Sequence, residues 1–248
     1  MNINNKYGTG PLQYELLQIM VEFHDFCVKK GIKYSLYGGS CLGAVRHSGF
    51  IPWDDDLDVV MDRENMEKFL NVQEDMSNLR AFVYLWTERV RRKENAMVNN
   101  TKPTLDVFVM DNAPNSRIMF KYKLFLLGFL QGMIKKHLKY KKRNLKDKVL
   151  VFLSHSIGKL FSEEKKNKMY ARVSQIGNTK KTRYIHCTST SFLWLKNTYK
   201  NDLLDSLVLH EFEGYRFFIM ENYHEYLTKC YGDYMQLPPE KERKPIHM

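Results

Sequence analysis

Residues 54–58 contain four aspartates, Asp54, Asp55, Asp56 and Asp58, and an apolar run follows directly after them. In an extended strand, side chains at alternate positions share one face, so Asp54, Asp56 and Asp58 should point the same way. Carboxylates this close repel one another unless a cation lies among them. Two carboxylates on one strand face suit Mg²⁺ or Mn²⁺, which prefer oxygen ligands and also take substrate phosphates. The spacing therefore predicts a metal site held by Asp56 and Asp58.

A third carboxylate, Asp106, lies between Leu105 and Val107 in the run LDVFVM, which we expect to form a neighbouring strand. Three such carboxylates can hold one or two metal ions that orient an attacking hydroxyl and stabilise a leaving phosphate. The alternatives are an acidic cap on the next helix or a calcium loop. Asp62 already supplies a cap, and the glycine spacing of an EF-hand is missing. We therefore predict Asp56, Asp58 and Asp106 to be both metal ligands and catalytic residues.

The tripeptide Gly38-Gly39-Ser40 is the second candidate feature, because it should follow a strand and open a helix. Glycine allows close approach of the backbone, and amides with a serine hydroxyl donate hydrogen bonds to phosphate oxygens. Such a tripeptide also occurs in ordinary tight turns, so it gains weight only beside the aspartates. Arg46 follows the glycines and is expected to contact the pyrophosphate of a bound nucleotide, with an ordinary surface position as the alternative.

Periodicity and turn residues predict the elements that must position these side chains. Together they indicate an α/β (α+β) fold, with a small mixed sheet flanked by helices. The expected helices are 11–30, 40–47, 62–70, 117–160, 163–176 and 222–231, and the expected strands are 32–36, 57–61, 81–86, 105–110 and 215–220. We expect a catalytic core at 1–116, a basic helical insertion at 117–180, and a part completing the core domain at 181–248.

These motifs together resemble the nucleotidyltransferase superfamily, in which a glycine-serine turn precedes an acidic strand and a later lone carboxylate. The chain is more closely similar to the LicD family of phosphotransferases. The stretches that carry the resemblance are LYGGSCLGAVRHSGFIPWDDDLDVVMDRENMEKFL, TLDVFVMD and FEGYRFFIMENYHEYLTKCYGDYMQLPP. They span nearly the whole chain.

The resemblance implies a nucleotidyltransferase-like fold and a metal-dependent transfer of phosphocholine, or a similar phosphorylated alcohol, from a CDP-activated donor. The acceptor would be a hydroxyl of a cell-surface glycan precursor, as in teichoic acid or lipopolysaccharide. By position, Asp56 and Asp58 would bind the metal, Asp106 would be the third carboxylate, and Gly38, Gly39 and Ser40 would contact phosphate.

Two other function classes remain as alternatives. One is a non-catalytic nucleotide-binding or regulatory protein, which has little need for three mutually repelling carboxylates. The other is a nucleotidyltransferase acting on RNA, which the match over the whole chain to the LicD family disfavours. We therefore expect no nucleic-acid partner.

The net charge of +11 is concentrated in one segment. Residues 117–148 contain eleven Lys or Arg and one acid, Asp147, which leaves a net charge of +10 for this segment. Apolar residues from Phe120 to Leu138 recur at helical spacing, but the uncharged run 124–134 is too short to span a bilayer. An interfacial helix on an anionic membrane and a helix packed on the core are the two interpretations.

Cysteine usage and the N-terminal sequence bear on the compartment. The four cysteines are far apart and form no CxxC pair, which fits neither a disulfide framework nor a zinc site. The first residues lack the basic and apolar regions of a signal peptide. We expect a cytoplasmic protein, peripheral on the inner face of the membrane if the basic segment binds lipid.

Overall fold

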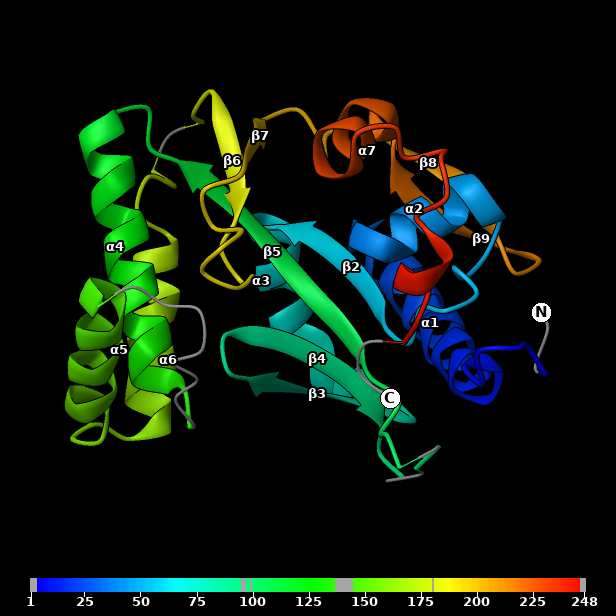
Figure 1. Ribbon diagram of the computed structural model, residues 1–248, viewed down its shortest axis with the longest axis horizontal. Coiled ribbons are helices and arrows are strands. Elements are labelled where there is room, and N and C mark those ends of the chain that lie inside the picture. The colour runs from blue at the N-terminus through cyan, green and yellow to red at the C-terminus, as the bar shows by residue number, and fades with distance from the viewer. Residues whose placement is uncertain (1–3, 95–96, 99, 137–144, 180, 246–248) are drawn as a thin grey trace. The chain divides into compact units, whose positions relative to one another are not determined.

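The computed structural model describes residues 4–94, 97–98, 100–136, 145–179 and 181–245. The chain forms two compact units, whose elements are labelled in Figure 1. Unit 1 comprises Met1–Phe82, Glu88–Val109 and Asp202–Met248, and unit 2 comprises Val83–Thr87 and Met110–Asn201. Helices and strands both occur throughout the chain, with runs of consecutive strands and of consecutive helices, which confirms the predicted α+β class.

The sheet of unit 1 has the strand order β1-β2-β5-β4-β3. Its strands are β1 (Ser35–Leu36), β2 (Leu57–Asp62), β5 (Leu105–Ala113), β4 (Thr87–Arg92) and β3 (Leu79–Tyr84). The pairs β1–β2 and β4–β5 are antiparallel, and Arg89 of β4 lies opposite Asp106 of β5. A second, two-stranded sheet pairs β8 (Leu207–Phe212) with β9 (Tyr215–Met220). The two predicted acidic strands, β2 and β5, are therefore neighbours.

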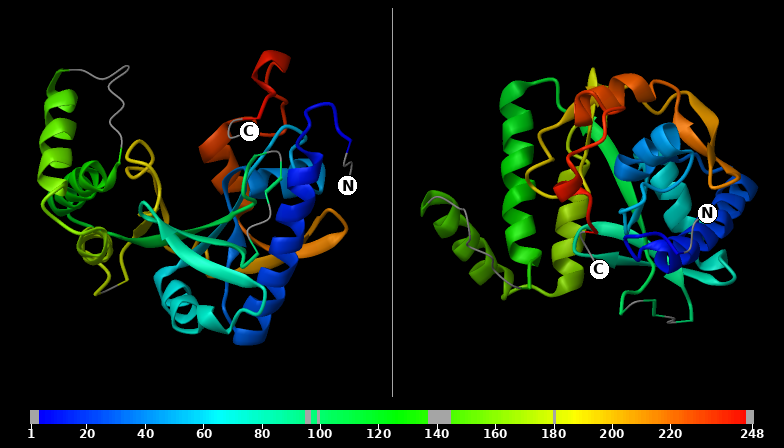
Figure 2. Two further views of the ribbon diagram at one scale, coloured as in Figure 1. Left: turned by 90° about the horizontal axis from the view of Figure 1, so that it is seen from below. Right: turned by 45° about the vertical axis from the view of Figure 1, so that its right-hand side comes forward.

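Four α-helices cover the sheets of unit 1: α1 (Gly10–Lys30), α2 (Gly38–His47), α3 (Arg63–Val72) and α7 (Tyr223–Tyr231). Short 3₁₀ turns lie at Gln73–Asp75 and Glu240–Glu242. The left view of Figure 2 shows α1 and α3 on one side of the sheet, and α7 with the C-terminal segment on the other. Phe23 packs edge-on against Tyr34 and Phe69, with ring centroids 5.5 Å and 5.7 Å away. This apolar layer leaves the opposite face of the sheet for polar side chains.

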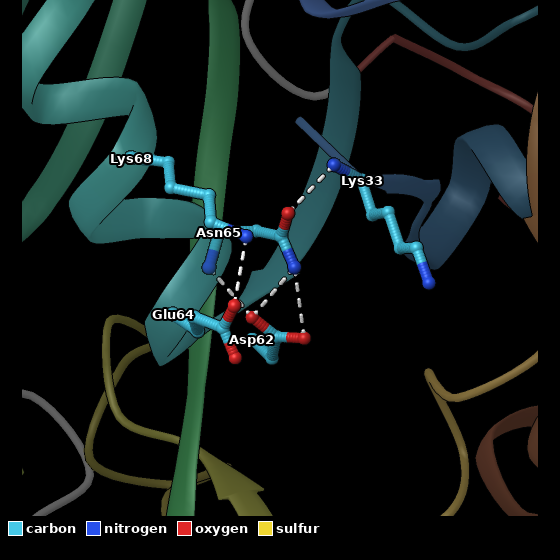
Figure 3. A network of polar contacts seen from close by, with 5 residues as sticks. All are labelled: Lys33, Asp62, Glu64, Asn65 and Lys68. Atoms are coloured by element: carbon cyan, nitrogen blue, oxygen red, sulfur yellow. Dashed lines mark hydrogen bonds and ion pairs between the residues drawn. The ribbon is translucent and has the colours of Figure 1, made fainter. Parts of the chain in front are cut away.

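The start of α3 shows how local chemistry fixes the end of β2 (Figure 3). An Asp62 carboxylate oxygen accepts from the Asn65 amide N–H at 2.7 Å, which satisfies a helix-end donor and confirms the predicted cap. The Asn65 side-chain oxygen accepts from the Lys33 amide at 2.8 Å, and this bond joins the helix start to the segment before β1. On the exposed face of the helix, Glu64 pairs with Lys68 at 2.7 Å.

Unit 2 contains the last residues of β5 and two further strands. There β5 pairs with β6 (Tyr184–Cys187), and β6 pairs with β7 (Thr198–Lys200). Its helices are α4 (Arg117–Ile134), α5 (Leu145–Gly158) and α6 (Glu163–Ser174), and both α5 and α6 contact α4. Leu127, Leu130 and Met133 of α4 form a buried cluster with Tyr170 of α6 and Leu195.

The basic segment is only partly described, because residues 137–144 and the side chains of 145–148 lie outside the described part of the chain. Lys123 is one of the eleven basic residues of this segment, but it is not on the surface. Its side chain is fully buried, and its ammonium donates to the Asn112 carbonyl at 2.8 Å. One side of α4 packs on the core, as Leu127 shows, while Ile118 and Phe125 are exposed by 82% and 53%. Within the described residues, no helix is both long and apolar enough to cross a membrane.

Candidate functional site

The clustered aspartates lie where the chain enters β2. Asp54, Asp55 and Asp56 precede the strand, which begins at Leu57, and Asp58 is its second residue. Asp55 is buried at 5% exposure, whereas Asp54, Asp56 and Asp58 keep more of their surface accessible. This alternation agrees with the predicted sharing of one face by Asp54, Asp56 and Asp58.

Hydrogen bonds tie the glycine turn to the acidic strand. The Tyr37 amide donates to the Asp58 carbonyl at 2.9 Å, and the Asp58 amide donates to the Ser40 hydroxyl at 2.8 Å. Because Ser40 is buried, its hydroxyl positions β2 against the start of α2. A hydroxyl that accepts one bond keeps its own proton for a further acceptor, so the predicted phosphate contact of Ser40 remains a prediction.

The two glycines of this turn are needed by the carboxylates beside them. Gly38 has a φ of +55°, and a Cβ added there would lie 3.1 Å from Asp58 Oδ2. A Cβ on Gly39 would lie only 2.6 Å from Asp54 Oδ2, closer than side chains approach in proteins. The absence of side chains at Gly38 and Gly39 therefore lets two carboxylates lie against the N-terminus of α2.

The amides at the start of α2 are partly engaged. The Gly38 amide donates to the Tyr226 hydroxyl at 3.0 Å, and the Ser40 amide donates to the Tyr37 carbonyl at 3.0 Å. The Tyr226 ring stacks on Tyr37 at 5.4 Å between centroids, which fixes its hydroxyl in this place. Sequence reasoning missed Tyr226, because its contact with Gly38 joins residues 188 positions apart.

The carboxylates of this site influence one another electrostatically. Burial raises the pKa of Asp58 well above its usual range, and the negative charges of Asp56, Asp106 and Asp54 raise it further. The positive charge of Arg89 lowers the pKa of Asp58. The structure thus brings Asp54, Asp56, Asp58 and Asp106 into one field, as the sequence predicted for three of them.

Asp106 is held by an arginine that sequence reasoning missed. Arg89 Nε lies 2.8 Å from Asp106 Oδ1, and Arg89 Nη2 donates to Oδ2 at 2.9 Å, so both carboxylate oxygens are engaged. This two-point contact fixes the orientation of the Asp106 carboxylate. The only sequence signal was the alternating run TERVRR in a strand that was not predicted.

Arg46 contacts the C-terminal segment. Its Nη1 donates to the carbonyls of Tyr234 at 2.8 Å and Gln236 at 3.4 Å. Burial lowers the pKa of Arg46, while Tyr231 and Asp54 oppose that shift, so the guanidinium lies in the field of the site. The predicted contact of Arg46 with a pyrophosphate stays a prediction beside this structural role.

Tyr231 is a further side chain over the glycine turn. A Cβ on Gly38 would lie 3.9 Å from the Tyr231 hydroxyl. Burial of this hydroxyl raises the pKa of Tyr231, and Cys230, Asp58 and Asp54 raise it further, although 45% of the residue's surface is exposed. Tyr231 therefore stays protonated and can donate a hydrogen bond beside the carboxylates.

Asp56 and Asp58 carry oxygen donors of the kind that divalent cations such as Mg²⁺ prefer. Burial raises the pKa of Asp58 and the charges of Asp56, Asp106 and Asp54 raise it further, so a cation beside these carboxylates would relieve their repulsion. Among the described residues, no group of three or more His, Cys, Asp or Glu side chains is placed so that it alone could hold a metal ion. Mg²⁺ commonly takes one or two carboxylates and completes its shell with water and substrate phosphates, and Asp56 and Asp58 can supply that pair.

Comparisons with known proteins identify the family of this chain. The family model described as "LicD/FKTN/FKRP, nucleotidyltransferase domain" matches residues 31–146, a range that contains every predicted site residue. An uncharacterized protein of Rickettsia prowazekii is 33% identical over 110 residues, or 44% of this chain and 38% of that protein. The lipopolysaccharide cholinephosphotransferase LicD of Haemophilus influenzae is 33% identical over 256 residues, which cover 95% of this chain and 94% of that protein. The chain therefore belongs to the LicD family of transferases.

Proposed function

We propose that this protein transfers phosphocholine from CDP-choline to a hydroxyl of a cell-surface glycan, with lipopolysaccharide as the first acceptor to test. The observation that carries the proposal is the 33% identity to a lipopolysaccharide cholinephosphotransferase over 95% of the chain. The carboxylate cluster supports it, since transfer of a charged phosphoryl group needs a site that positions the reactants and balances their charge.

In the proposed reaction, an oxygen of the acceptor hydroxyl attacks the choline-bearing phosphorus of the donor, and CMP leaves with the electrons of the broken P–O bond. Asp56 and Asp58 would hold Mg²⁺ or Mn²⁺, which when bound supplies positive charge against the donor pyrophosphate. Asp106 accepts the hydrogen bond of the attacking hydroxyl and takes up its proton. Arg89 keeps the Asp106 carboxylate in one orientation, since it contacts both oxygens.

The start of α2 supplies the contact with donor phosphate. A helix N-terminus carries partial positive charge, and Gly39 offers backbone without a side chain. Because Asp54 and Asp58 lie against these same glycines, phosphate and cation would meet at one point. Tyr231 would donate a hydrogen bond to an oxygen of the bound CDP-choline here.

The test is incubation of the full chain with choline-labelled CDP-choline, Mg²⁺ and phosphocholine-free lipopolysaccharide. We expect label in the lipopolysaccharide and one CMP released per label transferred. CDP-ribitol and CDP-glycerol, run in parallel, identify the alcohol. Absence of CMP release from all of these donors, with either Mg²⁺ or Mn²⁺, would contradict the proposed transferase activity. If cytidine nucleotides still raised the melting temperature, the protein would instead be a non-catalytic nucleotide-binding protein.

We further propose that unit 2 binds an anionic membrane surface. A groove of about 330 Å³ is lined by apolar side chains of α4 and α5, including Leu124, Phe125 and Leu150, with Lys121 and Lys135 beside them. Exposed apolar residues continue along both helices, as Phe152 at 57% exposure shows. Apolar side chains with lysines among them suit the boundary between headgroups and acyl chains, where each lysine contributes about 1 kcal/mol.

This surface is tested by sedimentation with vesicles. We expect the protein to sediment with vesicles containing phosphatidylglycerol at low salt and to be released at high salt. Lys121→Gln with Lys135→Gln should weaken binding, whereas Lys6→Gln with Lys68→Gln, two exposed lysines of unit 1, should not. Lys139, a further candidate lysine of the basic segment, lies outside the described residues. Equal binding of neutral and anionic vesicles would contradict the proposal.

A further inference from the structure

A row of arginines extends from the carboxylate site across the sheet of unit 1. Arg89 of β4 lies directly opposite Asp106 of β5 and pairs with it, so both side chains are on the face that carries the site. Side chains two residues apart on a strand share a face, so Arg91 is on that face too. Val90 between them is fully buried on the apolar side of the sheet.

The hairpin of β3 and β4 adds a second arginine beside Arg91. A two-residue connection, Leu85 and Trp86, joins the strands, and the Lys93 amide donates to the Asn78 carbonyl at 2.8 Å. Following this pairing inward by two residues places Arg80 directly opposite Arg91. Buried Leu79, one residue before Arg80, points to the apolar side, so Arg80 points to the face of the site.

Arg80 and Arg91 therefore place two positive charges opposite each other. Like charges directly opposite each other on antiparallel strands are destabilising. Burial lowers the pKa of Arg91, and the charge of Arg80 lowers it further. The Arg91 guanidinium lies 4.4 Å from the centroid of the Phe82 ring, which holds it over the sheet.

The two arginines that flank Arg91 along β4 have acidic partners. Arg89 is engaged by Asp106, and Arg92, on the other side of the sheet, contacts Glu15 and Glu22. The buried Nε of Arg91 has no hydrogen-bond partner among the described residues. Guanidinium groups recognise phosphate or carboxylate by paired hydrogen bonds, so two of them side by side suit an anionic group.

We propose that Arg80 and Arg91 form a subsite for an anionic group, phosphate or carboxylate, carried by the acceptor glycan near its reacting hydroxyl. That the bound molecule is the acceptor glycan rests on the proposed function. It follows from the order of side chains on one face: carboxylates for the metal, Asp106 for the hydroxyl, and then the arginine pair. Arg91 is two residues beyond Arg89, about 7 Å along the strand, so an anion there would lie close to the hydroxyl that Asp106 receives.

The experiment measures binding by the full chain without CDP-choline or added metal. Glucose 6-phosphate, glucuronate and glucose are titrated while side-chain N–H signals of arginine are followed by NMR. We expect one or both anionic sugars to shift arginine signals, with affinity falling as salt rises, and glucose to shift none. Binding of only the phosphate, or only the carboxylate, identifies the group that the subsite takes.

Variants assign the signals to the subsite. Arg80→Gln and Arg91→Gln should each weaken binding of the anionic sugar about tenfold or more, since each removes hydrogen bonds to a charged group. Arg216→Gln, on β9 of the same unit, is the matched control and should bind like the wild type. Neither variant should lower the melting temperature much, because each removes one member of a repelling pair.

Three results would overturn the subsite: no binding of either anionic sugar, equal binding of glucose, or unchanged affinity in both variants. These results are distinguishable from failure of the proposed transferase. CMP release without anion binding would support the proposed transferase activity and contradict the subsite. Anion binding that depends on Arg80 and Arg91, without CMP release, would support the anion site and contradict the proposed transferase activity.

Discussion

Gly39→Ala tests whether the glycine turn exists to admit a carboxylate. The backbone of Gly39 lies outside the positive-φ region, so alanine is compatible with its conformation. The new Cβ would lie 2.6 Å from Asp54 Oδ2, and ordinary contact begins at 3.4 Å, so the Asp54 carboxylate must move by about 0.8 Å. The end of a flexible side chain can make this movement at small cost to folding.

The expected result separates activity from stability. Alanine favours helix over glycine by up to about 1 kcal/mol, which offsets the local crowding, so the free energy of unfolding should stay within about 1 kcal/mol of wild type. A displacement near 1 Å in a site that positions reactants can cost about 100-fold in rate. We therefore expect kcat/KM for phosphocholine transfer to fall by about that factor while the melting curve changes little.

A double-mutant cycle identifies the cause. If Gly39→Ala acts by moving Asp54, then Asp54→Ala alone and the double variant should have equal kcat/KM, because the displaced group is already gone. Activity of Gly39→Ala equal to wild type would refute the reasoning. Fully additive losses in the double variant would show that Gly39 acts elsewhere, for example through its backbone N–H.

Two further predictions concern folding energetics. Asp62→Ala should lower the free energy of unfolding by about 1 kcal/mol by removing the cap of α3, whereas Glu64→Ala, which removes only an exposed ion pair, should lower it less. Equal effects of the two variants in chemical denaturation would contradict the capping role. Burial raises the pKa of Glu88 from its usual 4.5 to about 7, so the native state keeps a proton that the unfolded chain releases, and stability should fall as pH rises from about 4.5 to 7. Glu88→Gln should remove that part of the pH dependence, at most about 3 kcal/mol, and an unchanged pH profile would argue against it.

Features set by neighbouring residues in the chain could be predicted from the sequence. The helix ending at Gly31 was predicted because glycine adopts the left-handed conformation seen there, with a φ of 63°. The strand after the aspartates, the capping by Asp62 and the strand Tyr215–Met220 follow from alternation and local hydrogen bonding. The same local reasoning identified the aspartates that the structure brings together.

Features that depend on pairing between distant segments could not be predicted. Arg89 reaches Asp106 only because β4 and β5 pair in one register, and the charged run of β4 does not resemble a strand. Tyr226 joins the glycine turn through tertiary packing alone. Lysine is rarely buried, so the burial of Lys123, whose ammonium donates to the Asn112 carbonyl, could not be predicted from the sequence.

The most direct test of the central claim is the transfer rate of Asp58→Asn at saturating Mg²⁺, with Asp62→Asn as control. Asparagine keeps the volume of Asp58 but removes its charge, and loss of a metal ligand should lower the rate at least about 100-fold. Asp62 is on the same strand, and asparagine also caps helices, so Asp62→Asn should keep wild-type turnover. Relief of repulsion should leave Asp58→Asn at least as stable as the wild type without metal. Near wild-type transfer by a folded Asp58→Asn would contradict the account.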